Sequence, residues 1–170
     1  MYKVNELPKM NTDNSETGCC PKFNPEPWKD EKLEFDDKLF VKAKTTNFLH
    51  VPLNMGSVMT KVMGAIQNSK SELNDGYFML SDDSSLWRGE HYIAVSKEVP
   101  DYTNLRLSGK FLTRTFEGPY NNAGRWRKEM KNYVSSKGKN LRKIYFFYTT
   151  CPKCAKHYGE NHVVGVAEVD

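Results

Sequence analysis

Hydrophobic residues in the first half of the chain follow two different periods. Residues 38–44 (KLFVKAK) alternate as in a strand, whereas residues 54–67 carry apolar side chains at the three- and four-residue spacing of a helix. Two further strand-like runs, 76–81 and 90–96, are joined by a polar turn. The first half therefore predicts the order strand, helix, strand, strand. The apolar stripe of the expected helix consists of Met55, Val58, Met59, Val62, Met63 and Ile66.

The second half repeats this order. Its predicted strand, helix and two closing strands cover residues 110–116, 122–137, 142–149 and 162–169. Asn54 and Asn122 are suitable N-caps for the two helices, and Gly138 suits the left-handed position after the second one. The apolar stripe of the second helix consists of Ala123, Trp126, Met130, Tyr133 and Val134.

The closing strands of the two halves are also similar in sequence. Residues 89–99 read GEHYIAVSKEV and residues 159–169 read GENHVVGVAEV. Chance can produce this much similarity between two strands, but the shared element order favours an internal duplication. We therefore expect an α+β fold, in which duplicated β-α-β-β units form one antiparallel sheet with two helices on one face.

The first 37 residues differ from the rest, being polar and rich in proline at Pro21, Pro25 and Pro27. We interpret residues 1–37 as an extended N-terminal arm, and residues 38–170 as the folded domain. Within the domain, repeat one covers residues 38–100 and repeat two covers residues 109–170. Trp28, Phe35 and the Cys19–Cys20 pair are the residues expected to pin the arm to the surface.

The strand predicted at 142–149 has apolar side chains on both faces. Ile144, Phe146 and Tyr148 point one way, and Tyr145 and Phe147 point the other. The helices can cover one of these faces. The other face needs either the arm or a ligand, and in the second case it would form an aromatic cleft for a small molecule.

Composition excludes several classes of protein. No apolar run approaches the roughly 18 residues that suggest a membrane span, and the polar N-terminal residues do not resemble a signal peptide. We therefore expect a cytoplasmic protein whose four cysteines are thiols or metal ligands. The net charge of +4 is too small to indicate nucleic acid, although residues 101–170 hold 13 basic and 6 acidic residues. That excess is either a solvated helix face or a surface for an acidic protein partner.

The cysteines form two pairs, one near each end of the chain. Cys151-Pro152-Lys153-Cys154 has the spacing of a zinc knuckle, a tight turn in which both thiolates meet one metal. Cys19 and Cys20 would complete a structural Zn²⁺ site of four ligands, with His157 as a substitute for one of them. A redox pair and four ordinary cysteines are the alternatives. The redox alternative is weakened because such motifs open a long helix, and few residues follow Cys154.

Part of the chain resembles a known family. A strand that runs into Phe116-Glu117-Gly118-Pro119-Tyr120, an amphipathic helix with Trp126, and a closing strand pair resemble the GyrI-like, effector-binding superfamily. The resemblance covers residues 38–170 and is strongest over 109–170. The GCCP sequence at 18–21 and CPKCAK at 151–156 are similar to a bacterial subgroup often described as hydrolases, but depart from the commonest superfamily pattern.

The resemblance implies a cleft that binds hydrophobic small molecules, with aromatic rings and an acidic residue. Some superfamily members are sensor domains, one type inhibits DNA gyrase, and some hydrolyse cyclopropane-containing compounds. A carboxylate in such a cleft can stabilise a cation or activate water. We expect Glu117 to be the catalytic base, with Tyr145 or Tyr120 orienting the substrate. The expected ligand-binding rings are those of Tyr120, Trp126, Phe147 and Trp87.

These assignments have structural alternatives. Glu117 can complement the dipole of the following helix, and Trp126 can belong to the core. The chain contains no HExxH, GxSxG or GxxxxGK[ST] motif, which disfavours zinc-protease, serine-hydrolase and nucleotide chemistry. His91 and His162 begin equivalent strands and are expected to be structural. The leading interpretation is a small-molecule-binding hydrolase, and the alternatives are a protein-interaction or inhibitor protein and a CxxC redox protein.

Overall fold

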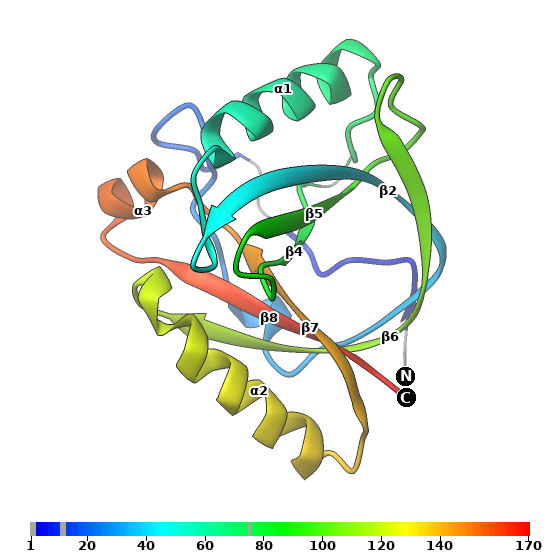
Figure 1. Cartoon of the computed structure of the whole chain (residues 1–170), viewed down its shortest axis with the longest axis vertical. Coiled ribbons are helices and arrows are strands. Elements are labelled where there is room, and N and C mark those ends of the chain that lie inside the picture. The colour runs from blue at the N-terminus through cyan, green and yellow to red at the C-terminus, as the bar shows by residue number, and fades with distance from the viewer. Residues whose placement is uncertain (1–2, 11–12, 75) are drawn as a thin grey trace. The chain divides into compact units, whose positions relative to one another are not determined.

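A computed structural model describes residues 3–10, 13–74 and 76–170 of the chain (Figure 1). The fold is α+β, and its strands pair antiparallel as predicted, apart from a short parallel pairing of residues 3–4 with residues 33–34. The elements are β1 (Lys3–Val4), η1 (Glu26–Trp28), β2 (Lys32–Phe48), β3 (Val51–Pro52), α1 (Met55–Asn68), β4 (Met79–Asp82), β5 (Arg88–Ala94), β6 (Thr103–Glu117), η2 (Tyr120–Asn122), α2 (Ala123–Ser136), β7 (Leu141–Tyr148), α3 (Pro152–Tyr158) and β8 (His162–Val169).

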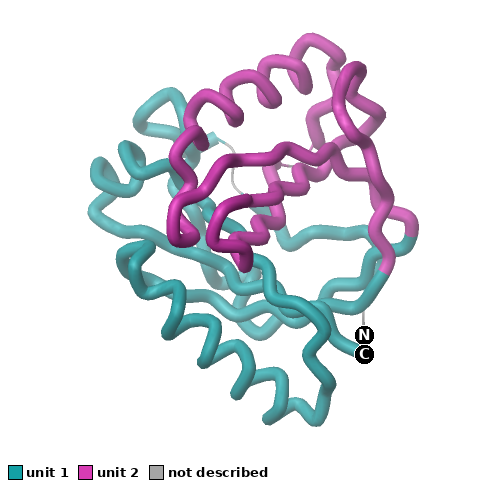
Figure 2. Tube along the Cα trace, in the orientation of Figure 1, with its two compact units in different colours: residues 1–36, 109–170 teal, residues 37–108 magenta. Residues whose placement is uncertain are grey.

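The chain divides into two compact units, coloured separately in Figure 2. Unit 1 comprises residues 1–36 and 109–170, and unit 2 comprises residues 37–108. The order strand, helix, strand, strand occurs twice along the chain, as β2, α1, β4, β5 and as β6, α2, β7, β8. Most of the first series lies in unit 2 and most of the second in unit 1, although β2 and β6 each have residues in both units. The duplication and the predicted division into arm and repeats stay predictions.

In unit 1, β8 lies between β6 and β7 and is antiparallel to both. Helix α2 packs on one face of these strands, where the ring of Trp126 stacks on Phe116 with centroids 5.6 Å apart. The close approach of the helix requires a glycine beneath it, because a Cβ at Gly165 would lie 2.6 Å from the Sδ of Met130. Ile144, Phe146 and Tyr148 face this helix, as the alternation predicts.

The arm covers the opposite face of the same strands. Trp28 is fully buried, and its ring packs against Phe147 with centroids 5.4 Å apart. Phe23 contacts Phe147 edge-on at 6.1 Å. The hydroxyl of Thr113 on β6 donates to the backbone oxygen of Trp28 at 2.6 Å. The arm therefore covers this aromatic face at Phe147, which was one of the two predicted possibilities.

Unit 2 is built on β5, which pairs antiparallel with β2 on one side and β4 on the other. The apolar stripe of α1 buries Val62 and Ile66 against these strands. His91 on β5 is fully buried, and its two ring nitrogens contact the hydroxyls of Thr45 at 3.0 Å and Ser81 at 2.8 Å. Burial lowers the pKa of His91 below its usual value, although nearby carboxylates oppose the shift.

The predicted side-chain caps at the starts of α1 and α2 were wrong, whereas the predicted glycine after α2 is confirmed. Asn54 precedes α1 but does not cap it, because its side-chain oxygen accepts a hydrogen bond from the Thr46 backbone N–H. Asn122 likewise makes no capping bond to α2. Gly138 follows α2 with a φ of 66°, as its position predicts. None of the helices in the described part of the chain is long and apolar enough to cross a membrane.

Candidate metal centre and an adjacent hollow

The four cysteines meet at one point in unit 1, and we call them the cysteine cluster. Cys19 and Cys20 lie on a loop of the arm, Cys151 immediately precedes α3, and Cys154 is buried in the first turn of that helix. Their four Sγ atoms all lie within 4.8 Å of one another. Residues separated by more than 130 positions are thus brought together, and the cluster could hold a metal ion.

The local sequence explains how α3 presents two of these sulfurs. Pro152 occupies the first helical turn, where its fixed φ is favourable and its missing N–H costs nothing. Gly159 ends the helix in the left-handed conformation with a φ of 71°. Cys151 and Cys154 are three residues apart, so their side chains lie on the same side of this first turn. The expected tight turn was therefore wrong, since the motif opens a short helix.

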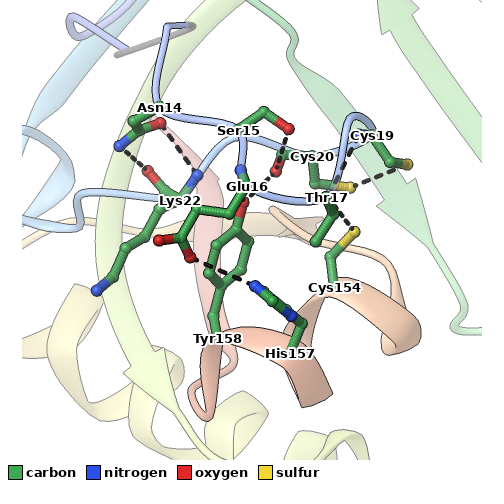
Figure 3. A network of polar contacts seen from close by, with 10 residues as sticks. All are labelled: Asn14, Ser15, Glu16, Thr17, Cys19, Cys20, Lys22, Cys154, His157 and Tyr158. Atoms are coloured by element: carbon green, nitrogen blue, oxygen red, sulfur yellow. Dashed lines mark hydrogen bonds and ion pairs between the residues drawn. The ribbon is translucent and has the colours of Figure 1, made fainter.

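The arm loop that carries Cys19 and Cys20 is closed at its base (Figure 3). The side-chain amide of Asn14 donates to the backbone oxygen of Lys22 at 3.1 Å, and its oxygen accepts from the Lys22 N–H at 3.1 Å. The hydroxyl of Tyr158 on α3 donates to the backbone oxygen of Cys20 at 2.7 Å and accepts from the Glu16 N–H at 3.1 Å. These bonds attach the closed loop to α3.

The surroundings of Cys154 and Cys20 shift the pKa values of their thiols in opposite directions. A hydrogen-bond contact with Thr17 lowers the pKa of the Cys154 thiol to about 6, against the effect of burial. Burial raises the pKa of Cys20 well above its usual value. Burial and the neighbouring Cys151 and Cys20 raise the pKa of Tyr120 to about 12. Four thiolates this close repel one another unless a cation lies between them.

The geometry of the cluster fits a tetrahedral metal. Zinc–sulfur bonds of about 2.3 Å place the sulfurs of a tetrahedral site about 3.8 Å apart. The Sγ atoms of Cys19 and Cys20 are 3.7 Å apart. Soft thiolates in a tetrahedral set are typical ligands of zinc. The donor set and this one sulfur–sulfur distance therefore agree with a closed four-cysteine site, and all the other separations are within 4.8 Å.

A hollow of about 400 Å³ lies in unit 1 beside the arm loop. Nε2 of His162, the first residue of β8, lies 3.4 Å from a carboxylate oxygen of Glu160. The ring of Phe23 lies 6.2 Å from that of His162. The lining residues are Asn14, Lys22, Phe23, Asn24, Pro25, Glu26, Glu160 and His162.

The two expected catalytic residues lie on different strands of unit 1. Glu117 is exposed at the end of β6 and pairs in register with His162 of β8. Tyr145 is buried in β7 and pairs with Val166 of β8, under the ammonium group of Lys143. Positions 162 and 166 of a strand are about 13 Å apart. The structure therefore does not bring Glu117 and Tyr145 to one point.

The four expected ligand-binding rings are also dispersed. The hydroxyl of Tyr120 donates to the backbone oxygen of Thr150 at 2.8 Å, beside the cysteine cluster. Trp126 and Phe147 are each 1% exposed, under α2 and the arm respectively. Trp87 belongs to unit 2, where it is 56% exposed and packs against Phe48. None of these rings lines the hollow.

Sequence reasoning missed the pairing of His162 with Glu160. His162 was expected to be structural because it begins a strand equivalent to that of His91. The available signal was a carboxylate two residues before a histidine at a strand start, because residues two apart in an extended chain point to the same side. Nothing in the local sequence of residues 22–26 of the arm indicated that they line the hollow.

Solved structures with a similar fold come from Listeria innocua. An uncharacterized conserved protein has 12% identity and a TM-score of 0.57, over 84% of this chain and 93% of that one. Two chains described as hydrolases have 9% and 12% identity and TM-scores of 0.57 and 0.55, over 84% of this chain and 92% of each. At these identities the likeness shows the fold alone.

A search of curated proteins found no match. The model of a protein family described as bacterial hydrolase, in contrast, matches residues 10–169. This match spans both units and includes all four cysteines and the lining of the hollow. The chain therefore belongs to the bacterial hydrolase family.

Proposed function

We propose that this protein is a hydrolase of small hydrophobic electrophilic compounds of the cyclopropane type. The observation that carries the proposal is the family match over residues 10–169. The substrate class follows from the resemblance of the Phe116–Tyr120 segment to GyrI-like proteins, with their duplicated β-α-β-β fold. The same resemblance supports binding of a small hydrophobic molecule.

Glu117 is the residue that we assign as the base. It is exposed at the end of β6, so water can reach its carboxylate. Tyr120 lies three residues further along, in η2, and is held by Thr150. The strand register argues against Tyr145 as its partner, and Tyr120 is therefore the ring that we assign to orient the substrate.

The test is turnover by the full chain of three hydrophobic electrophiles: benzyl acetate, styrene oxide and an acyl-substituted phenylcyclopropane. General-base catalysis contributes roughly 10²- to 10⁴-fold, so Glu117→Gln should lose at least about a hundredfold in turnover. Glu98→Gln, an exposed carboxylate of unit 2, is the control and should leave turnover unchanged. Absence of turnover of all three compounds by the wild-type chain would contradict the hydrolase.

We also propose that the cysteine cluster binds one structural Zn²⁺. The observation that carries this second proposal is the meeting of four Sγ atoms within 4.8 Å. Cys19, Cys20, Cys151 and Cys154 would all be ligands, and a closed set of four leaves no position for substrate. The metal would fix the arm loop to α3 and contribute folding free energy to a polar segment.

Cobalt substitution tests the ligand set. Co²⁺ bound by four thiolates in a tetrahedron has intense visible absorption bands, whereas weaker bands indicate oxygen or nitrogen ligands. Cys154→Ser should reduce these bands, and Thr17→Val, which keeps all four sulfurs, should retain them. Reversible disulfide formation between Cys151 and Cys154 in a metal-free chain would instead favour the redox protein.

A further inference from the structure

We propose that the hollow is the substrate site of this enzyme, and that His162 acts there as the proton donor to the leaving atom. This inference rests on the proposed hydrolase function and assigns it a location and a second catalytic group. Glu117 adjoins the hollow as the strand partner of His162, and Phe23 replaces Tyr120, which does not line the hollow, as the ring that contacts the substrate. Hydrolysis needs one group that takes a proton from water and another that returns a proton to the atom released.

The hollow has the volume of a small-molecule site and is open to solvent. Its volume of about 400 Å³ lies in the range of about 300 to 1,000 Å³ that such sites occupy. Phe23 and Pro25 provide apolar surface, and Asn14 and Asn24 provide polar groups. The ring of Phe23 would pack against the single aromatic group of a compact substrate, and the polar side chains would surround its reacting group.

His162 and Glu117 are placed as a donor and base pair. They are direct partners in the antiparallel β6–β8 pairing, so their side chains lie on the same face with Cβ atoms about 5 Å apart. Glu160 contacts Nε2 of His162 at 3.4 Å, and this contact orients the ring. The side chain of His162 is only 12% exposed, so a bound substrate would remove it almost completely from water.

The proposed step balances in protons and electrons. Glu117 accepts a proton from water as the oxygen forms a bond to the electrophilic carbon. The bond from that carbon to its leaving atom breaks in the same step for an epoxide or a cyclopropane, and after water has added to the carbonyl carbon for an ester. In each case the electron pair stays on the leaving atom. His162 gives that atom a proton, and a proton then passes from Glu117 to His162 through solvent, which restores both groups.

Charge around the hollow predicts which substrates are excluded. Glu26 and Glu160 line it and Glu117 lies beside His162, whereas Lys22 is the only Lys or Arg among the lining residues. An anionic substrate would therefore be repelled. Benzyl acetate should be turned over faster than its 4-carboxylate derivative, which has the same reacting group.

The matched control is a second histidine–glutamate pair. Nε2 of His157 on α3 lies 3.4 Å from Glu16, the same separation as in the His162–Glu160 pair, but neither residue lines the hollow. His162→Gln should lower turnover of the fastest of the three electrophiles at least tenfold, and His157→Gln should change it less than twofold. Equal effects of the two substitutions would overturn the assignment of His162.

A binding measurement makes the site testable without turnover. Benzyl alcohol, the product of benzyl acetate hydrolysis, should shift the NMR signals of the His162 ring and leave those of His157 in place. If the alcohol shifts neither ring or both equally, the hollow is not the substrate site. If it shifts His162 alone but no electrophile is turned over, the hydrolase and the proton-donor role fail and the binding site stands.

Discussion

The hydroxyl of Thr17 lies 3.2 Å from the Sγ of Cys154, although the two residues are 137 positions apart in the chain. This contact joins the arm loop to the first turn of α3. Nothing in the local sequence pattern of the arm predicts such a contact, since residues 13–24 form no helix or strand. The arrangement is therefore maintained by side-chain contacts, namely those at the cysteine cluster and those of Tyr158, and by any metal bound there.

Removing one sulfur should release the arm loop. Cys154→Ser weakens a four-thiolate site, so backbone amides of residues 14–22 should exchange with deuterium at least tenfold faster than in the wild-type chain. Hydrogen exchange read by mass spectrometry measures this directly. Amides of α1 in unit 2 are the internal control, and unchanged exchange in the loop would show that the cysteines do not hold it.

The closure of the loop by Asn14 should have a measurable effect of its own. Asn14→Ala removes two hydrogen bonds to Lys22, and for such exposed bonds we expect a loss of about 1 kcal/mol in free energy of unfolding. Urea unfolding of the full chain, followed by tryptophan fluorescence, measures it. Asn68→Ala, an exposed residue at the end of α1, should change this value by less than about 0.5 kcal/mol.

Trp28 should be the largest single contributor of the arm to stability. Its ring is fully buried on Phe147, and truncation of such a ring typically costs about 3 to 5 kcal/mol. We expect Trp28→Ala to lower the melting temperature strongly, and Trp28→Phe to recover part of the loss. A melting temperature unchanged by Trp28→Ala would mean that the arm does not cover this face in solution.

Stability should fall in mild acid because of His91. Its pKa in the folded chain is lowered by burial, so the unfolded chain, with a pKa near 6.5, gains a proton first as the pH falls. The contribution of neutral His91 to the free energy of unfolding is complete well above pH 6.5 and is lost progressively as the pH falls below this value. Urea unfolding at pH 7.5 and 5.5 should show this loss, and His91→Gln should show a smaller difference between the two pH values.

Strong periodicity made the regular elements of the fold predictable. The bounds of β8 were predicted without error, because a run rich in valine from His162 to Val169 is bordered by polar residues. α2 was predicted to within one residue at each end, since its apolar stripe is long and Gly138 follows it. The start of β2 was missed. The strand begins at Lys32 rather than at residue 38, and its first residues were assigned to the arm because several of them are charged.

The candidate site was less predictable, because it depends on contacts between distant segments. The pairing of the two cysteine pairs could be predicted from residue type alone. The helix at Pro152 was missed although Pro152 and Gly159 both signal helix ends, because the CxxC spacing was interpreted as a turn. The hollow was missed because its two sides come from the arm and from the start of β8.

The central claim is that the four cysteines hold one metal ion and thereby fix the arm. The most direct test is the zinc content of the full chain, purified without added zinc. We predict about one Zn²⁺ per chain, and much less in Cys154→Ser purified in the same way. A wild-type chain that is folded, with the arm loop protected from exchange but without near-stoichiometric metal, would contradict the claim.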